Sequence, residues 1–135
     1  MKNQILIIED NDDDVLMIKR GFKKGKIANA IHRVTNGKEA LEYLNNNDIS
    51  SIQLLLLDLN MEVMNGFDFL MKREEDIRIK QIPVVVLTSS NRKEDIERAY
   101  ALGANSYVEK PLDPIKFMEA IMAIENFWLY LAKKP

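Results

Sequence analysis

Three acidic side chains stand where short apolar runs end. Glu9 and Asp10 follow the run 4–8, and Asp58 follows four consecutive leucines, Leu54–Leu57. Carboxylates brought close together repel one another unless protons or a cation intervene. A set of oxygen ligands suits Mg²⁺, with Mn²⁺ as the alternative. Because a carboxylate beside such a cation can attack a phosphoryl group and form an acyl phosphate, Asp58 is a candidate nucleophile.

Two further polar side chains end apolar runs later in the chain. Thr88 closes the run 83–88, and Lys110 follows the run 105–109. In phosphoryl transfer, an ammonium group neutralises charge on the phosphoryl oxygens and a hydroxyl donates a hydrogen bond to one of them. The backbone carbonyl of Asn60 is a further candidate metal ligand. The predicted site therefore has Asp58 as phosphoacceptor, Glu9, Asp10, Asp58 and Asn60 as metal ligands, and Thr88 and Lys110 as phosphoryl contacts.

The elements that must position these residues follow from the apolar pattern. The leucine run is short and wholly apolar, which is typical of a strand buried on both faces. Further strands are predicted at 4–8, 30–34, 83–88 and 105–109, with helical patterns between them. This alternation predicts an α/β fold, (βα)5, in which helices cover both faces of a doubly wound five-stranded parallel sheet. Since the carboxyl ends of parallel strands share one edge, the candidate residues should meet there.

Polar residues mark where the helices begin. Asn36 with Glu39 forms a capping pattern, and Asp113 precedes Pro114 in the preferred order of cap and then proline. The acidic run 12–14 precedes an apolar helix face. We expect this run to cap the helix and to be solvated rather than to bind metal.

Asp58 and His32 could each have a purely structural role. Asp58 as a mere turn or helix cap is disfavoured, because Asp10 and Lys110 are expected at the same edge and convergent titratable groups mark sites. His32, the single histidine, stands at the short second strand, and we expect it to be exposed and inert. A histidine that relays phosphate would lie on a helix.

Composition limits the function classes. The 135 residues fit one domain, 1–135, and 47% of them are hydrophobic, which is typical of a globular protein. A net charge of -2 gives no reason to expect nucleic acid as a partner. The absence of cysteine excludes disulfides and thiolate chemistry. No apolar stretch is long enough for a membrane span and no signal peptide is evident, so we expect a cytoplasmic protein without an output domain.

At this point the chain resembles the response-regulator receiver domains of two-component signalling. Five separated segments carry the resemblance: 7–11, 57–61 with Gly66, 87–89, 103–104 and 110–111. It implies a flavodoxin-like sheet with strand order 2-1-3-4-5 and a phosphoryl group transferred to Asp58 by a sensor histidine kinase. It also implies that Glu9 and Asp10 hold Mg²⁺, that Thr88 and Lys110 contact the phosphoryl group, that Tyr107 moves with Thr88 as a switch, and that the Lys110–Pro111 bond is cis.

One residue departs from the family pattern. Glu62 stands where the family usually has proline, in the loop after the phosphoacceptor. We expect its carboxylate to face solvent, and the loop conformation stays open. Glu62 is also the sole support for an alternative function, a receiver-like interaction module that switches without phosphate. In neither case is the chain expected to be an enzyme in the ordinary sense.

The last helix carries two apolar stripes. Phe117, Ile121, Ile124, Trp128 and Leu131 form one, and Met118, Met122 and Leu129 form the second. The second stripe is either a surface for a partner or part of a wide buried face. The segment 125–129 resembles that of small single-domain receivers that partner phytochrome-type kinases. This resemblance implies a homodimer formed through the last helices. A downstream protein target completes the predicted partners.

Overall fold

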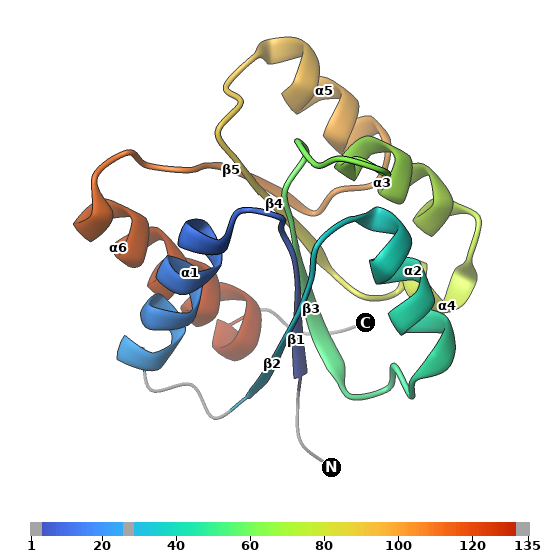
Figure 1. Cartoon of the computed structure of the whole chain (residues 1–135), viewed down its shortest axis with the longest axis horizontal. Helices are drawn as coiled ribbons and strands as arrows, with labels where there is room; N and C mark the ends of the chain where they lie inside the picture. The colour runs from blue at the N-terminus through green and yellow to red at the C-terminus, as the bar shows by residue number, and fades with distance from the viewer. Residues whose placement is uncertain (1–3, 26–28, 132–135) are drawn as a thin grey trace.

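The computed structural model describes residues 4–25 and 29–131. Its sheet has five parallel strands in the order β2-β1-β3-β4-β5, which confirms the predicted fold and strand order (Figure 1). The strands are β1 (Gln4–Ile8), β2 (Ala30–Val34), β3 (Ile52–Leu57), β4 (Val84–Thr88) and β5 (Ser106–Glu109). The helices are α1 (Asp12–Lys24), α2 (Gly37–Asn46), α3 (Gly66–Glu74), α4 (Ile77–Lys80), α5 (Lys93–Ala101), α6 (Pro114–Glu125) and the π-helix η1 (Asn126–Leu131).

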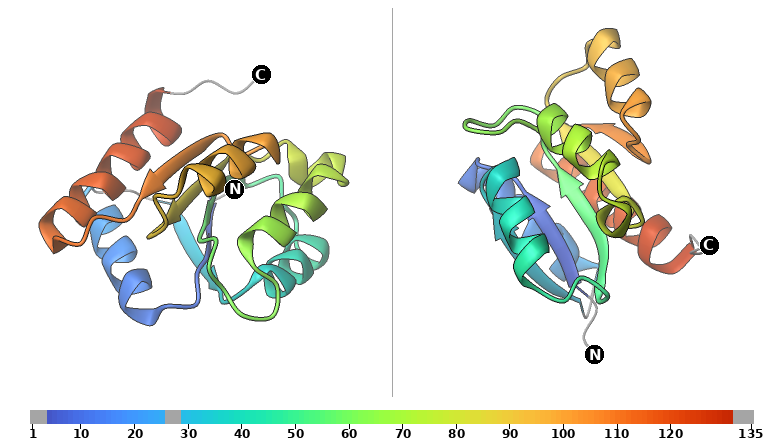
Figure 2. Two further views of the ribbon diagram at one scale, coloured as in Figure 1. Left: turned by 90° about the horizontal axis from the view of Figure 1, so that it is seen from above. Right: turned by 90° about the vertical axis from the view of Figure 1, so that its right-hand side faces the viewer.

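Helices cover both faces of the sheet because the central strands are apolar on both sides. Alternate residues of β1, β3 and β4 enter two separate cores. One core packs against α2, α3 and α5, and the other packs against α1 and α6. Figures 1 and 2 show α1 and α6 together on one side of the sheet. Wholly apolar strands such as 54–57 therefore do not need to alternate with polar residues.

Backbone hydrogen bonds continue the ladder beyond the strand ends. The amide of Asp58 donates to the Ile8 carbonyl at 3.0 Å, and the amide of Glu9 donates to the Val34 carbonyl at 3.0 Å. The amide of Lys110 donates to Thr88 at 2.7 Å. These bonds fix the backbone of each of the three predicted site residues to the end of a neighbouring strand, before any side chain is considered.

Side-chain caps begin most helices. The carboxamide of Asn36 accepts from the Glu39 amide at 2.9 Å, and Asp113 accepts from the Ile115 amide at 2.8 Å. Both caps confirm the sequence prediction. Asn11, rather than the acidic run 12–14, caps α1 by accepting from the Asp14 amide at 2.9 Å.

Arg73 of α3 links the segments that lead into β4 and β5 at the amino edge of the sheet. Its side chain is 3% exposed. Its guanidinium donates to the backbone carbonyls of Lys80, Ile82 and Gly103, at 3.0, 2.9 and 3.2 Å. These carbonyls lie just before β4 and β5 and on α4. Burial lowers the pKa of Arg73, with Glu74 acting in the opposite direction. This buried cation was not predicted, because no periodicity distinguishes Arg73 from an exposed helix residue.

Three expectations require correction or completion. The Lys110–Pro111 bond is trans, since no cis peptide bond occurs in the described residues; trans is the ordinary preference of a proline amide. The short helix α4 was not predicted. The last helix was expected to be continuous, but it changes to the π-helix η1 at Asn126.

The C-terminal apolar stripes are neither fully buried nor freely exposed. Phe117, Ile121 and Ile124 are buried, and Trp128 packs beside them. The second stripe, Met118, Met122 and Leu129, is half-buried, whereas Phe127 is 51% exposed. The side chain of Leu131 lies outside the described part.

Candidate functional site

The carboxyl edge of the sheet collects the predicted residues from four strand ends. Glu9, Asp58 and Thr88 are buried, at 2%, 6% and 0% exposure. The ammonium of Lys110 lies 2.5 Å from Glu9 Oε1 and 3.7 Å from Asp58 Oδ2. The structure therefore joins the ends of β1, β3 and β5 around one partly buried ammonium group, with Thr88 at the end of β4 beside them.

Three carboxylates at this edge form a candidate cation site. One oxygen each from Glu9, Asp10 and Asp58 lies within 4.8 Å of the other two. Asp10 is exposed, so a bound cation can keep water ligands on that side, as Mg²⁺ prefers. The side chain of Asn60 is exposed, and the role of its carbonyl stays a prediction.

Two buried polar atoms at the edge have no hydrogen-bond partner among the described residues. They are Oδ1 of Asp58 and Oγ1 of Thr88. Leaving a buried polar atom unpaired costs free energy, so native structures rarely do so without a reason. A cation on Asp58 and a phosphoryl oxygen on Thr88 would satisfy them. The donor set and the unpaired carboxylate oxygen thus fit a divalent cation.

Burial and neighbouring charges at the carboxyl edge shift the pKa values of Glu9 and Lys110. Burial raises the pKa of Glu9 to about 8, the nearby Asp58 carboxylate adds to the rise, and Lys110 opposes it. For Lys110, burial acts to lower the pKa, but the carboxylates of Asp14, Asp58 and Glu9 outweigh it and the pKa is raised. The ammonium group is therefore charged at neutral pH, whereas Glu9 exchanges a proton near neutrality.

Two side chains that the sequence did not assign to the site also contact it. Asp14 Oδ2 lies 2.8 Å from the ammonium of Lys110, so the expectation that the whole run 12–14 is solvated is wrong for Asp14. Arg33 Nε donates to the Glu9 carbonyl at 2.8 Å, and its Nη2 lies 2.8 Å from Asp12 Oδ1. Arg33 is the second-last residue of β2, near the same edge, so its position in a strand was the available signal.

Backbone hydrogen bonds hold the loop after Asp58 close to the end of β3. The amide of Gly66 donates to the Leu59 carbonyl at 3.0 Å, and the Gly37 amide donates to Met64 at 2.9 Å. Val63 has φ 70°, a left-handed conformation unusual for a β-branched residue, and it is the sole non-glycine with positive φ in the described chain.

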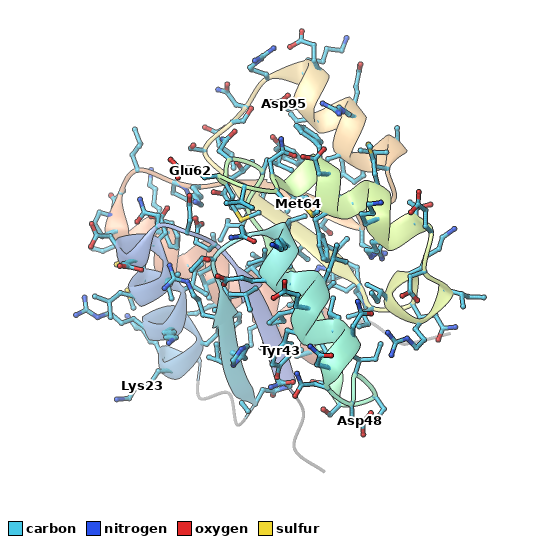
Figure 3. The ribbon with its side chains drawn as sticks, turned by 45° about the vertical axis from the view of Figure 1, so that its right-hand side comes forward. Lys23, Tyr43, Asp48, Glu62, Met64 and Asp95 are labelled. Carbon is cyan, nitrogen blue, oxygen red and sulfur yellow. The ribbon has the colours of Figure 1, made fainter. Side chains whose placement is uncertain are left out.

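Glu62 is exposed, as expected, and it is not part of the carboxylate cluster. It lines a groove of about 510 Å³ with Asp10, Asn60, Arg92 and Asp95. Figure 3 shows Glu62 on the loop after β3 and Asp95 on α5, far from Asp48 at the other end of the molecule. The groove therefore leads along the loop to the edge that holds Asp10.

Tyr107 points toward the loop after β4. Its half-buried hydroxyl donates to the Ser90 carbonyl at 2.9 Å, and its amide donates to the Tyr100 hydroxyl at 3.1 Å. Burial raises the pKa of Tyr107, with Ser90 opposing the rise. This one conformation leaves the switch role of Thr88 and Tyr107 a prediction. His32 is exposed as expected, and its ring stacks on Tyr43 at 4.2 Å.

The sequence comparisons agree with this geometry. Residues 5–122 match the family model of the response regulator receiver domain. The chain belongs to this family. The receiver is similar to FilR2 of Methanothrix harundinacea, a probable methanogenesis regulatory protein, at 34% identity over 97% of this chain and 86% of the relative. It is similar to the response regulator Rcp1 of Synechocystis sp. at 29% identity, over 97% of this chain and 92% of Rcp1.

Solved structures extend the likeness. The receiver matches the phosphorylated cyanobacterial phytochrome response regulator RcpA with TM-score 0.92 and 32% identity, over 100% of this chain and 99% of RcpA. It matches the Mn²⁺-bound form of Rcp1 with TM-score 0.89 and 28% identity, over 98% and 99% of the two chains. The predicted resemblance to phytochrome-associated single-domain receivers is confirmed. In the described part, no helix has the length and apolar character needed to cross a membrane.

Proposed function

We propose that this receiver accepts a phosphoryl group on Asp58 in a Mg²⁺-dependent reaction and passes the signal on through changed protein contacts. The carrying observation is the buried carboxylate of Asp58, whose Oδ1 has no partner in the described chain and whose Oδ2 lies 3.7 Å from the Lys110 ammonium. A nucleophile needs a free oxygen and a nearby cation to accept an incoming anion.

In the proposed reaction an oxygen of Asp58 forms a bond to phosphorus while the bond from phosphorus to the donor breaks. With a phosphohistidine donor, the nitrogen–phosphorus bond breaks and its electron pair stays on the imidazole. The Lys110 ammonium neutralises charge on the transferred group, and the buried Thr88 hydroxyl is available to donate to it. The new aspartyl phosphate is an acyl phosphate.

Glu9, Asp10 and Asp58 are the residues that would hold the divalent cation, with the Asn60 carbonyl as a proposed fourth ligand. When bound, Mg²⁺ or Mn²⁺ supplies positive charge that lets phosphoryl oxygens approach the clustered carboxylates. The Lys110 ammonium lies among these carboxylates, so the chain itself offsets part of their negative charge.

The test is phosphate uptake measured by intact mass, with acetyl phosphate and MgCl₂ as donor and cofactor. The wild type should gain one phosphoryl group, and Asp58→Asn should gain none. The matched control is Asp48→Asn, which alters an exposed aspartate at the opposite end of the molecule. Equal uptake by Asp58→Asn would remove that residue as phosphoacceptor.

The alternative, an interaction module that switches without phosphate, has one favouring observation. Glu62 replaces the usual proline and is followed by the unusual backbone of Val63. Absence of both Mg²⁺ binding in calorimetry and phosphate uptake in the wild type would favour this module over the proposed phosphoacceptor.

The proposed partners are a sensor histidine kinase and a downstream protein. Similarity to phytochrome response regulators supports a phytochrome-type kinase as the donor. A homodimer through the last helices is supported by the exposed Phe127 beside the half-buried Trp128 and Leu129. Cytoplasmic location stays a prediction.

A further inference from the structure

We infer that Asp14 is a positioning residue that holds Lys110 in the unphosphorylated state and competes with the phosphoryl group for its ammonium. The inference rests on the proposed phosphorylation of Asp58 and adds a residue that opposes it.

The contacts of Lys110 carry the first step. Its ammonium donates to Glu9 Oε1 at 2.5 Å and to Asp14 Oδ2 at 2.8 Å, but Asp58 Oδ2 lies at 3.7 Å, beyond hydrogen-bond distance. An ammonium group has three N–H donors, so two are engaged before phosphate arrives. In this state Lys110 is bound more closely to the two α1-side carboxylates than to the phosphoacceptor.

The two carboxylates that bind Lys110 differ in what else they can do. Glu9 belongs to the candidate cation cluster with Asp10 and Asp58, whereas Asp14 does not. A bound cation would therefore provide Glu9 with a second positive partner, whereas Asp14 pairs with Lys110 in the described chain. We therefore expect the contact to Asp14 to be the one that Lys110 gives up when a phosphoryl group binds to Asp58.

The start of α1 positions the Asp14 carboxylate close to Lys110. Asp14 lies in the first turn of α1, and its amide donates to the Asn11 side chain, which fixes the backbone from which the carboxylate extends. Its side chain is 28% exposed, compared with 87% for Asp12 two residues earlier. A partly buried charge-assisted hydrogen bond is stronger than an ordinary surface ion pair, so its loss has a measurable effect.

Asp13→Asn is the matched control for Asp14→Asn. Both residues lie in the first turn of α1, so each substitution removes one negative charge from the same helix end. Asp13 is exposed and has no ion pair in the described chain. Any difference between the two variants therefore reports on the contact with Lys110 rather than on net charge.

The experiment measures the affinity for beryllofluoride, a phosphoryl analogue, in the full chain with MgCl₂ by fluorine NMR titration. Asp14→Asn should bind about three- to tenfold more tightly than the wild type, because Lys110 no longer has to leave a carboxylate. Asp13→Asn should stay within about twofold, and Asp14→Glu, which keeps a carboxylate, should restore most of the wild-type affinity. Unchanged or weaker binding by a folded Asp14→Asn overturns the inference.

Failure of the proposed function would look different. In that case the wild type itself takes up neither beryllofluoride nor phosphate from acetyl phosphate, or Asp58→Asn takes up as much as the wild type. If Asp58 is labelled and Asp14→Asn behaves like Asp13→Asn, phosphorylation stands and the role of Asp14 is refuted. Thermal melting of each variant confirms that the compared proteins are folded.

Discussion

Two cationic side chains lie at opposite edges of the same sheet, and the acceptors of their hydrogen bonds differ in kind. Arg73 at the amino edge donates to the backbone carbonyls of Lys80, Ile82 and Gly103. Lys110 at the carboxyl edge is surrounded by ionisable carboxylates, and Asp58 Oδ1 nearby stays unpaired in the described chain. Hydrogen bonds to neutral backbone acceptors stabilise the fold, whereas charged acceptors beside an unpaired oxygen form a site whose contacts can change.

The largest expected effect is at the amino edge. Arg73→Met should lower the free energy of unfolding by about 3 kcal/mol or more, because it leaves three backbone carbonyls without their buried donor. Urea denaturation measures this change. Arg78→Met, at an exposed arginine of α4, should stay within about 0.5 kcal/mol. Similar values for the two variants would contradict the stabilising role of Arg73.

The second effect is a pH dependence confined to the carboxyl edge. Because the pKa of Glu9 is raised to about 8, a cation must displace a proton from this carboxyl at lower pH. Mg²⁺ affinity should therefore rise from pH 6 to 8, by up to about tenfold per unit, and level off above. Calorimetric titration at several pH values tests this, and Glu9→Gln should flatten the profile. A flat wild-type profile would show that Glu9 does not titrate with binding.

The third effect has the opposite sign to that of Arg73→Met. At pH 9, above the raised pKa of Glu9, Asp58→Asn should raise the free energy of unfolding by about 1 kcal/mol without Mg²⁺, since it removes the carboxylate whose repulsion helps to raise that pKa. Urea denaturation with and without MgCl₂ should show the advantage shrinking when the cation is present. A loss of stability on this substitution would mean that the Asp58 carboxylate stabilises the fold, as Arg73 does.

The smallest effect concerns Arg33, whose side chain contacts the carboxyl edge through the backbone carbonyl of Glu9. Arg33→Gln removes the donor to the Glu9 carbonyl and the pair with Asp12, so Mg²⁺ affinity should fall about two- to threefold. Asp12→Asn removes the exposed ion pair alone and should change the affinity less. Equal effects in calorimetry would assign the role to the ion pair rather than to the carbonyl contact.

The sequence predicted what depends on local pattern and on topology. Apolar runs located all five strands, and the shared carboxyl edge brought Glu9, Asp58 and Lys110 together as expected. The contacts of Asp14 and Arg73 were missed because each depends on a residue distant in the chain, 96 positions away for Asp14 and Lys110. Neither one-dimensional periodicity nor capping preference carries such information.

The end of the last helix shows a different limit. The two stripes assumed one helical period through Leu131, but the chain adopts a π-helix from Asn126. A wider turn rotates each later side chain away from its α-helical direction, so Phe127 is half exposed while Trp128 contacts the core. The cis prediction for Lys110–Pro111 came from family resemblance alone, and the structure has trans.

Gly66 packs directly against the backbone of Asp58 and Leu59. A Cβ atom there would lie 2.5 Å from the carbonyl oxygen of Asp58 and 2.8 Å from Cα of Leu59, both of them backbone atoms that cannot swing aside. Any larger residue at this position must displace the backbone that carries Asp58. The side chains of Glu62 and Val63 are exposed on the outer side of the loop and meet no such steric limit, whereas the inner side has room for a hydrogen atom alone.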